Sequence, residues 1–455
     1  MKPYRNILET IGKTPLVQIT RLDTGPCELF LKLENQNPGG SIKDRIALSM
    51  IEAAERDGSL TPGGTLIEAT AGNTGLGLAL VASQKGYRLT LIIPDKMAQE
   101  KIFHLRALGA DIRMTRSDVG KGHPEYYQDM AERLTAETPG AIYVNQFSNP
   151  ANPLAHETGT GPEIWEQMDH KVGAVVVGVG SGGTLSGIGR YMRRVSPTTK
   201  MILADPKGSV LAPLVQTGKM TEAGSWLVEG IGEDFVPPNC DLSLVSEAFI
   251  VSDAESFATA RELLRKEAIL AGSSSGTLLT AALRYCRAQK TPQRVVTFVC
   301  DSGNKYLSKM FNDYWMLDQG LLAREQKGDL RDLIARRHAD RATVTVTPQD
   351  SLLIAYQRMK LYEISQLPVL DNGKVAGIID ESDLLLAVYG HAGRYHDPVS
   401  SAMTGRVETV QAGDPLSRLV EIFRRDHAAL VMDGNEFLGL VTRIDLLNHL
   451  RRSIA

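Results

Sequence analysis

Residues 37–45 read Asn-Pro-Gly-Gly-Ser-Ile-Lys-Asp-Arg, a loop that leads directly into a helical pattern. The Pro-Gly-Gly sequence favours a tight turn, and Ser41 can cap a helix expected over Ile42–Asp57. Lys43 then lies in the first helical turn, where the positive end of the helix dipole lowers the pKa of an ammonium group. A lysine that forms a Schiff base needs such a lowered pKa. Taken alone, Lys43 is more simply interpreted as an exposed surface lysine.

Three further loops of small residues lie between an apolar segment and a helical pattern. Thr70–Gly75 reads TAGNTG after a strand expected to end at Glu68, and suits a carboxylate or phosphate at a helix start. Gly178–Thr184 reads GVGSGGT and suits a phosphate monoester or, with Asp205 on the next strand, a dinucleotide. Gly272–Gly276 reads GSSSG, the nucleophile-elbow pattern of hydrolases, but the helix expected before it argues against a hydrolase.

The chain up to about residue 320 alternates short apolar strands with amphipathic helices. Such alternation predicts an α/β fold with parallel sheets, in which ligands bind at the carboxyl ends of the strands. The expected strands are Leu29–Leu33, Thr65–Glu68, Leu89–Ile93, Ile112–Met114, Ala174–Val179, Met201–Ala204 and Val295–Val299. The expected helices include Ile42–Asp57, Gly75–Lys85, Gln99–Leu108, Thr184–Val195 and Ser256–Glu267.

The composition changes after residue 320. Residues 321–340 are dense in charges of both signs, and we expect a solvated linker helix there rather than a basic docking site for a partner. An internal repeat follows, because residues 344–352 and 377–385 resemble 407–416 and 439–447. Each copy reads strand, helix, strand, strand, helix. The repeat predicts two small units, 341–395 and 396–455, that cover each other's apolar faces.

Charge and composition exclude several classes of protein. The 455 residues hold 50 Lys and Arg against 53 Asp and Glu, which excludes a globally basic nucleic-acid-binding protein. No apolar stretch is long enough to cross a membrane, and the first residues lack the apolar core of a signal peptide. The 4 cysteines form no Cys-x-x-Cys pair, so we expect no metal site and a reducing, cytoplasmic location.

The four loops, in this order, resemble those of the fold-type II pyridoxal-phosphate (PLP) enzymes, which perform β-replacement on serine-type amino acids. The resemblance covers nearly all of residues 4–318, including Ile-Gly-Lys-Thr-Pro-Leu at 11–16. The C-terminal repeat resembles the tandem CBS (Bateman) module of the cystathionine β-synthase family. Residues 228–235, VEGIGEDF, also resemble that family, whereas QFSNPANP at 146–153 is closer to the related cysteine synthases. The resemblance implies a catalytic domain over 1–320, tryptophan synthase β-like with two open parallel-sheet subdomains.

The resemblance also implies a role for each matching residue. Lys43 would hold PLP and, once freed, would remove and return the Cα proton of the substrate. Asn73 would hydrogen bond the ring hydroxyl of the cofactor, and Ser274 would face its pyridine nitrogen. The phosphate would lie among Gly180, Ser181, Gly182, Gly183 and Thr184. The amino-acid substrate would lie among Thr70, Gly72, Thr74, Gln146 and Glu229.

Three positions depart from the family pattern. Ala71 stands where the family usually has serine, and Glu233 and Phe147 stand where tyrosine is common. These departures bear on the choice of thiol and leaving group more than on the class of reaction. The haem-binding extension of animal members has no counterpart before residue 4, so the resemblance implies PLP without haem.

The implied reaction is a PLP-dependent lyase step of transsulfuration and cysteine biosynthesis. L-Serine and L-homocysteine would give cystathionine and water, and cysteine with homocysteine would release hydrogen sulfide. The alternatives are an O-acetylserine sulfhydrylase (cysteine synthase), and an adenosyl-ligand sensor with a vestigial enzyme domain. Intact Lys43, Asn73 and Ser274 argue against the sensor.

The CBS repeats imply a regulatory ligand and a homodimer or higher homo-oligomer. Thr442 and Asp445 in the second repeat match the Thr-x-x-Asp pattern, whose aspartate accepts both ribose hydroxyls of an adenosyl compound. Asp380 replaces the Ser or Thr of that pattern in the first repeat, where a carboxylate would repel a phosphate. The pattern leaves open S-adenosylmethionine, another adenosyl compound, or a module that only dimerises the chain.

Overall fold

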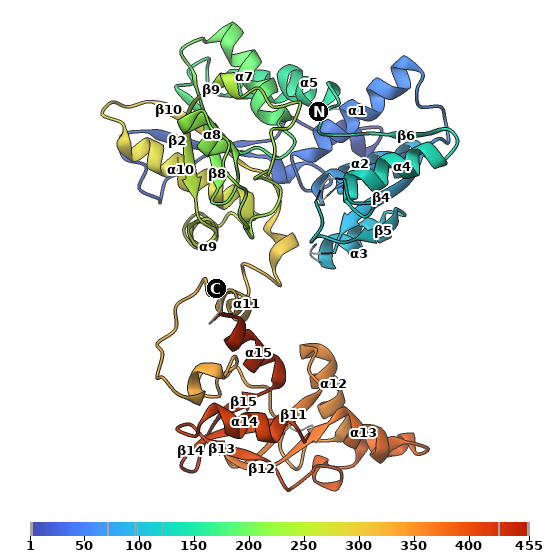
Figure 1. Cartoon of the computed structure of the whole chain (residues 1–455), viewed down its shortest axis with the longest axis vertical. Coiled ribbons are helices and arrows are strands. Elements are labelled where there is room, and N and C mark those ends of the chain that lie inside the picture. The colour runs from blue at the N-terminus through green and yellow to red at the C-terminus, as the bar shows by residue number, and fades with distance from the viewer. Residues whose placement is uncertain are drawn as a thin grey trace. The chain divides into compact units, whose positions relative to one another are not determined.

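The computed structural model describes residues 3–70, 72–95, 97, 99–120, 122–425 and 428–452 (Figure 1). The chain divides into two compact units, the first ending at Phe311 and the second beginning at Asn312. The division falls before helix α11 (Asp313–Asp318), whereas the sequence places these residues in the catalytic domain. Among the described residues no helix is long and apolar enough to cross a membrane.

The larger sheet of the first unit has six strands in the order β1-β2-β10-β7-β8-β9. All neighbouring strands are parallel except β1, which pairs antiparallel with β2. Helix α10 packs against β8, β9 and β10. The strands are β1 (Leu16–Gln18), β2 (Glu28–Leu33), β7 (Ala174–Val177), β8 (Lys200–Pro206), β9 (Val245–Val251) and β10 (Arg294–Val299). The helices that follow them include α7 (Gly183–Val195), α8 (Leu211–Thr217), α9 (Asp253–Glu267) and α10 (Ser273–Ala288).

The smaller sheet of the first unit has four parallel strands in the order β5-β4-β3-β6. Leu66 and Leu91 belong to a core with α1 and α2, whereas Ile67 and Ile92 pack against α4, so helices cover both faces. The strands are β3 (Thr65–Ala69), β4 (Arg88–Pro94), β5 (Asp111–Thr115) and β6 (Ala141–Tyr143). The helices are α1 (Lys43–Asp57), α2 (Asn73–Lys85), α3 (Gln99–Ala107), α4 (Tyr127–Glu137), α5 (Ala151–Ala155) and α6 (Gly161–Gln167).

The two open parallel sheets confirm the predicted fold class of the first unit. The alternation of strands and helices carried that prediction, because each crossover between parallel strands needs a helix. Helix α9 precedes the Gly272–Gly276 loop, as expected, so the strand that a hydrolase nucleophile elbow requires does not stand directly before it.

The second unit contains the predicted internal repeat. The first copy has an isolated bridge at Val346, then α12 (Leu352–Tyr362), β11 (Gln366–Asp371), β12 (Lys374–Asp380) and α13 (Glu381–Val388). The second copy has β13 (Thr409–Gln411), α14 (Leu416–Phe423), β14 (Ala429–Asp433), β15 (Glu436–Val441) and α15 (Arg443–Arg452). The second copy follows the expected order of strand, helix, strand, strand, helix, and the first copy follows it with an isolated bridge in place of the first strand.

The linker helix that we expected over 321–340 is wrong. The stretch contains only one short 3-10 turn, η6 (Leu330–Leu333), and is otherwise irregular. Gly328 has a φ of +76°, and the carboxylate of Asp332 accepts from the backbone N–H of Lys327 and Gly328, which holds a turn rather than a helix. Leu330 packs into the core of the second repeat. The charged residues of this stretch do not repeat with the period of a helix. The packing of a few leucines therefore determines its irregular conformation.

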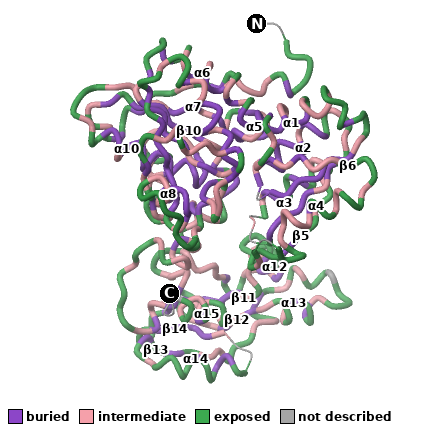
Figure 2. The backbone as a smooth tube through the Cα atoms, turned by 45° about the horizontal axis from the view of Figure 1, so that its top comes forward, coloured by how far each residue is buried: buried purple, intermediate pink, exposed green. Residues whose placement is uncertain are grey.

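Both units contain buried residues (Figure 2), but the burial of polar groups differs between them. Among the described residues, every polar or charged side chain that is buried lies in the first unit, and the last of them is Lys305. A buried polar group is costly unless its partners are fixed, so these groups mark where the first unit is most tightly specified.

Candidate active site

Lys43 is the first residue of α1, where the sequence placed it. Its backbone N–H donates to the hydroxyl of Ser41 at 3.2 Å, and the N–H of Ile42 donates to the carbonyl of Cys300 at 2.8 Å. The loop is thereby fixed to the carboxyl end of β10. Burial lowers the pKa of Lys43, although Cys300, Asp301 and Glu233 act in the opposite direction. The predicted direction is confirmed, but burial is its first cause, rather than the helix dipole.

The Thr70–Gly75 loop joins β3 to α2, with Gly72 at a φ of +139° directly before the helix. The hydroxyl of Thr70 accepts from the N–H of Gly72 at 3.2 Å. The hydroxyl of Thr74 donates to the side-chain oxygen of Gln146 at 2.6 Å. Thr70, Thr74 and Gln146 are all buried, so the structure gathers these three predicted substrate residues at one helix start. Ala71, the departure from serine in this loop, lies outside the described residues.

The Gly180–Thr184 loop lies between β7 and α7, and its glycines have no room for a side chain. A Cβ at Gly183 would lie 1.9 Å from the side-chain oxygen of Asn152, and one at Gly180 would lie 2.5 Å from the carbonyl of Gly230. Gly182 has a φ of +85°, which disfavours other residues. Close approach of bare backbone at a helix start is what a phosphate needs.

Asn152 connects the phosphate loop to the substrate loop. Its side-chain N–H groups donate to the carbonyl of Gln146 at 2.7 Å and to the hydroxyl of Ser181 at 2.9 Å. The hydroxyl of Thr184 lies 3.3 Å from Nε2 of His156. Burial first, and then Arg45 and Lys43, hold the pKa of His156 well below its ordinary value, so its ring is neutral. Sequence reasoning missed both Asn152 and His156, which lie far from the motif in the chain.

The structure argues against a dinucleotide at the Gly180–Thr184 loop. Asp205, its required ribose ligand, is fully buried at the end of β8. Its Oδ2 accepts from the backbone N–H of Ala212 at 2.8 Å, at the start of α8. A carboxylate committed to a helix start and shielded from solvent cannot hold ribose hydroxyls, so the phosphate monoester remains.

Ser274 lies in the first turn of α10 and is 4% exposed. Its neighbours tie this turn to the rest of the site: Ser275 Oγ accepts from the N–H of Cys300 at 2.9 Å, and Ser273 Oγ accepts from the N–H of Glu229 at 3.0 Å. The predicted partner of a pyridine nitrogen is therefore a neutral hydroxyl, held on a rigid and buried helix start.

Asn73, the first residue of α2, is held at both ends of its amide. Its Oδ1 accepts from Nζ of Lys305 at 2.8 Å, and its Nδ2 donates to Oδ2 of Asp301 at 2.8 Å. Oδ2 of Asp301 also accepts from the hydroxyl of Tyr306 at 2.7 Å. Sequence reasoning missed Asp301, Lys305 and Tyr306. The available signal was a polar run directly after the apolar strand β10, at the edge where parallel strands place ligands.

Glu229 lies on the loop between α8 and β9 and forms two ion pairs. Its carboxylate is 2.5 Å from Nζ of Lys101 on α3 and 2.7 Å from Nζ of Lys309. Burial acts to raise the pKa of Glu229, but the two lysines outweigh it and lower that pKa. The side chain of Lys101 passes close to Gly72, with its Cδ 2.9 Å from where a Cβ would stand. Glu229 thus reaches the substrate loop through Lys101, a residue that the sequence did not indicate.

These residues fit pyridoxal phosphate. The bare backbone at Gly180–Thr184 suits a phosphate monoester, and Lys43 supplies an amine whose pKa is lowered. Asn73 supplies an amide donor, and the N-terminus of α7 directly after the loop supplies backbone N–H groups that suit an anion.

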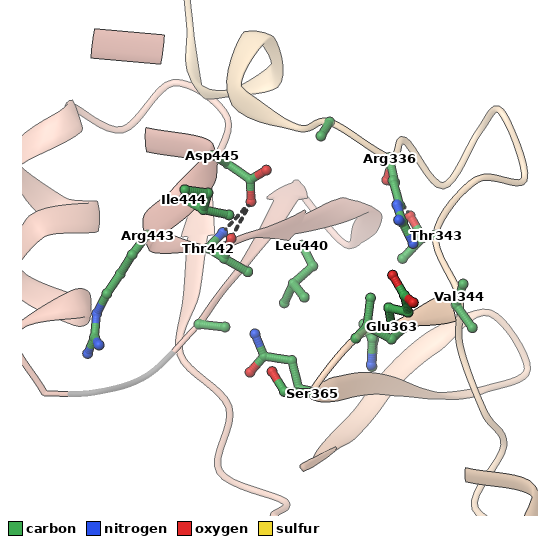
Figure 3. A pocket seen from close by; sticks show the side chains of 15 residues that line it. Arg336, Thr343, Val344, Glu363, Ser365, Leu440, Thr442, Arg443, Ile444 and Asp445 are labelled. Carbon is green, nitrogen blue, oxygen red and sulfur yellow. Dashed lines mark hydrogen bonds between the residues drawn. The ribbon is translucent and has the colours of Figure 1, made fainter. Parts of the chain in front are cut away.

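The second unit contains a separate pocket of about 490 Å³ (Figure 3). Thr442 donates to Oδ2 of Asp445 through its backbone N–H at 2.7 Å and through its hydroxyl at 2.6 Å. The predicted pair is therefore preformed at the wall of a pocket to which both repeats contribute. Its lining includes Thr343, Glu363 and Ser365 from the first repeat and Thr442, Arg443 and Asp445 from the second.

The corresponding pair in the first repeat shares one of these contacts, because in both repeats the aspartate accepts from the backbone N–H three residues before it. Oδ1 of Asp380 accepts from the N–H of Asp383 at 2.8 Å, and Oδ2 of Asp383 accepts from the N–H of Asp380 at 3.1 Å. The two carboxylates form a reciprocal capping box at the start of α13. Burial raises the pKa of Asp383. The backbone N–H of Asp380 acts to lower that pKa, whereas the charge of the Asp380 carboxylate acts to raise it.

Two protein-family models match the chain. The model described as "Pyridoxal-phosphate dependent enzyme" matches residues 7–301, and the model described as "CBS domain" matches residues 331–390 and 399–452. The first covers the unit that holds Lys43, and the second covers both copies of the internal repeat.

Similar proteins extend the match to the whole length. Cystathionine beta-synthase of Dictyostelium discoideum is 36% identical over 98% of this chain and 92% of its own length. The Saccharomyces cerevisiae protein of the same name is 36% identical over 98% of this chain and 97% of its own. Cysteine synthase A of Escherichia coli is 40% identical over 66% of this chain. A solved structure of a hydrogen sulfide-producing enzyme from Fusobacterium nucleatum is 36% identical, with a TM-score of 0.63 over 67% of this chain and 100% of that one.

Proposed function

Because this chain belongs to the cystathionine β-synthase family of pyridoxal-phosphate-dependent enzymes, we propose that it condenses L-serine with L-homocysteine to give cystathionine and water. One observation carries the choice of substrates. The relatives named cystathionine beta-synthase match across both units, whereas the cysteine synthase matches 66% of the chain. The class of reaction, PLP-dependent β-replacement, is that of the family.

Lys43 is the catalytic residue of this proposal. It holds the cofactor through Nζ and later moves a proton to and from Cα of the substrate, for which its lowered pKa suits it. When bound, PLP supplies the electron-withdrawing ring that makes the Cα proton and the β-substituent labile. Ser274 would face the ring nitrogen with a neutral hydroxyl, which cannot keep that nitrogen protonated as a carboxylate could.

Two loops bind the charged ends of the ligands. Thr70, Thr74 and Gln146, with the N-terminus of α2, hold and orient the substrate carboxylate, and Gly72 with its positive φ turns the chain into that helix. Gly180, Ser181, Gly182, Gly183 and Thr184 hold the cofactor phosphate at the N-terminus of α7. Glu229 acts on the substrate side through Lys101, the lysine that covers Gly72.

The second unit binds an adenosyl compound in the pocket of Thr442 and Asp445. The support is a preformed pair in the second repeat and a pocket of suitable size. Family membership further supports PLP as the cofactor and a homodimer or higher oligomer. The near-neutral charge supports small amino-acid partners rather than nucleic acid.

The deciding experiment compares two substrate pairs on the same purified holoenzyme. We expect kcat/KM for serine with homocysteine to exceed that for O-acetylserine with sulfide by about tenfold or more, about 1.4 kcal/mol of transition-state binding. Cystathionine is identified by mass spectrometry, with and without S-adenosylmethionine. The reverse preference would identify a cysteine synthase. Nucleotide binding with neither reaction would identify a sensor.

The cysteine synthase is kept as a second candidate because one segment favours it. QFSNPANP at 146–153 includes Gln146 and Asn152, both in the site, and resembles cysteine synthases more closely. Hydrogen sulfide release is tested in the same assay with cysteine and homocysteine. The similar Fusobacterium nucleatum protein supports including this reaction, since that protein is a hydrogen sulfide-producing enzyme.

A further inference from the structure

Lys305 is a buried cation whose hydrogen-bond partners are all neutral. It lies in the short turn η5 (Gly303–Tyr306) after β10 and is 8% exposed. Its Nζ donates to Oδ1 of Asn73 at 2.8 Å and to the carbonyls of Gly39 and Gly40 at 3.3 Å each. Among the described residues it forms no ion pair with a carboxylate. A buried charge without a counter-charge in contact is costly, which indicates that an anion belongs nearby.

The charges around Lys305 come from three elements. Asp301 precedes the turn, Asp44 is on α1, and Lys101 is on α3. Burial is the first cause that lowers the pKa of Lys305; Asp301 and Asp44 raise it, and Lys101 lowers it further. Of the two carboxylates, Asp301 is committed to Asn73 and Tyr306, and Asp44 to the N–H of Gly39 at 2.6 Å.

The hydrogen bond from Lys305 sets the orientation of the Asn73 amide, with its oxygen toward Lys305 and its nitrogen toward Asp301. Oδ1 takes a hydrogen bond from the ammonium, and one N–H of Nδ2 is donated to Asp301. The second N–H of Nδ2 remains able to donate to a third partner that accepts. Because Nζ withdraws electron density through Oδ1, the remaining N–H is a stronger donor than that of an isolated amide.

We propose that Lys305 is a positioning residue that, through Asn73, holds the ring oxygen of the cofactor as an oxyanion. The proposal rests on the proposed function, which places that oxygen beside Asn73. The ring oxygen would then be an anion close to Lys305, whose direct hydrogen-bond partners are all neutral. The competing interpretation is a purely structural tether, in which Lys305 only ties the Gly39-Gly40 turn to η5.

The test is the absorption spectrum of the holoenzyme, titrated between about pH 6 and pH 10 and compared among variants. Ionisation of the ring oxygen moves the cofactor band between the visible and the near ultraviolet. In Lys305→Met, which removes the charge and keeps the length, we expect intensity to shift to the near-ultraviolet band. The apparent pKa of that transition is expected to rise by about one unit, a tenfold change in the ionised fraction. Lys305→Arg is expected to keep the visible band, because it restores the charge.

Lys290→Met is the matched control, since Lys290 is an exposed lysine outside the site. A tether would lower the melting temperature in Lys305→Met but leave the band and its pH titration as in the wild type, and this outcome overturns the proposal. Lys305→Gln, which can still donate to Asn73 without a charge, replaces Lys305→Met if the latter does not fold, and is read in the same way. A wild-type protein without any cofactor band would instead refute the proposed function.

Discussion

The two units of the molecule place their site residues in opposite environments. In the first unit Asn73, Ser274 and Lys305 belong to a network of half-buried and buried groups whose partners are fixed by the fold. In the second unit Thr442 and Asp445 are half-buried, and no polar side chain among the described residues of that unit is fully buried. Catalysis needs charges that are oriented before the substrate arrives, whereas a regulatory site can leave ordering to the ligand.

The ion pairs show the same difference. Arg45, two residues after Lys43, pairs with Glu34 at 2.7 Å and with Glu163 at 2.7 Å, and its side chain is 5% exposed. In the second unit Arg418 pairs with Glu421 at 2.9 Å, with side chains 46% and 61% exposed. The buried pairs fix the start of α1 to the turn after β2 and to α6, whereas the exposed pair lies in solvent.

The largest expected effect comes from removing the reactive amine. Lys43→Ala should reduce β-replacement by at least about 10³-fold, because the variant loses both the covalent anchor and the proton carrier. Cystathionine formation and the visible band of the cofactor are measured together. Retention of both colour and turnover in Lys43→Ala would refute the role of Lys43. Adenosyl binding by the second unit, measured by calorimetry, serves as the control for folding.

The next effect contrasts a buried and an exposed ion pair. Arg45→Met leaves the buried Glu34 without its cation, while Glu163 keeps Lys32, and should cost about 3–5 kcal/mol of unfolding free energy. Arg418→Met should change it by less than about 1 kcal/mol, because solvent screens that pair. Urea denaturation of the two variants measures the contrast. Equal losses would show that burial does not separate the two units in the way described.

A smaller effect compares the two CBS repeats. Asp445→Asn should weaken adenosyl binding by about tenfold, near 1.4 kcal/mol, because an amide cannot accept from two ribose hydroxyls as a carboxylate does. Asp383→Asn is the matched control in the first repeat, where the carboxylates cap α13. Calorimetry with S-adenosylmethionine and with adenosine monophosphate separates the candidate ligands. Equal weakening by both substitutions would contradict the assignment to the second repeat.

The last effect is a pH dependence that Glu68 in the first unit is expected to produce. Burial raises the pKa of Glu68, at the end of β3, from 4.5 to about 8, although the N–H groups of Gln146, Asn145 and Ala69 oppose it. Glu68 is therefore protonated when folded and ionised when unfolded between these two values. The unfolded state binds fewer protons in that window, so Glu68 makes stability fall as pH rises from about 4.5 to about 8.

Glu68→Gln removes this titration and keeps the shape of the side chain. We expect melting temperatures equal to the wild type near pH 4.5 and higher by a few degrees near pH 8. Differential scanning fluorimetry of both proteins across this range provides the measurement. A difference that does not grow with pH would show that Glu68 is ionised in the folded protein.

The sequence predicted what is local. The order of strand, glycine-rich loop and helix placed Lys43, Asn73, Ser181 and Ser274 at helix starts, because each motif is contiguous with its elements. It did not predict Lys305, which contacts Asn73 across 232 residues of chain. Nor did it reject Asp205 as a ribose ligand, because its burial depends on the packing of β8 and α8. The prediction of a linker helix failed for a related reason, since Leu330 packs onto a core formed by distant residues.

Asn152 has a consequence for the supply of cofactor. A single side chain donates both to Gln146 in the substrate loop and to Ser181 in the phosphate loop. Whatever orders one loop then favours order in the other, and such coupling is reciprocal. An amino-acid substrate is therefore expected to slow the escape of the vitamin-derived cofactor, and the cofactor to tighten the hold on the substrate. When the vitamin is scarce, substrate-bound molecules of this protein would therefore be expected to lose their cofactor more slowly than substrate-free molecules.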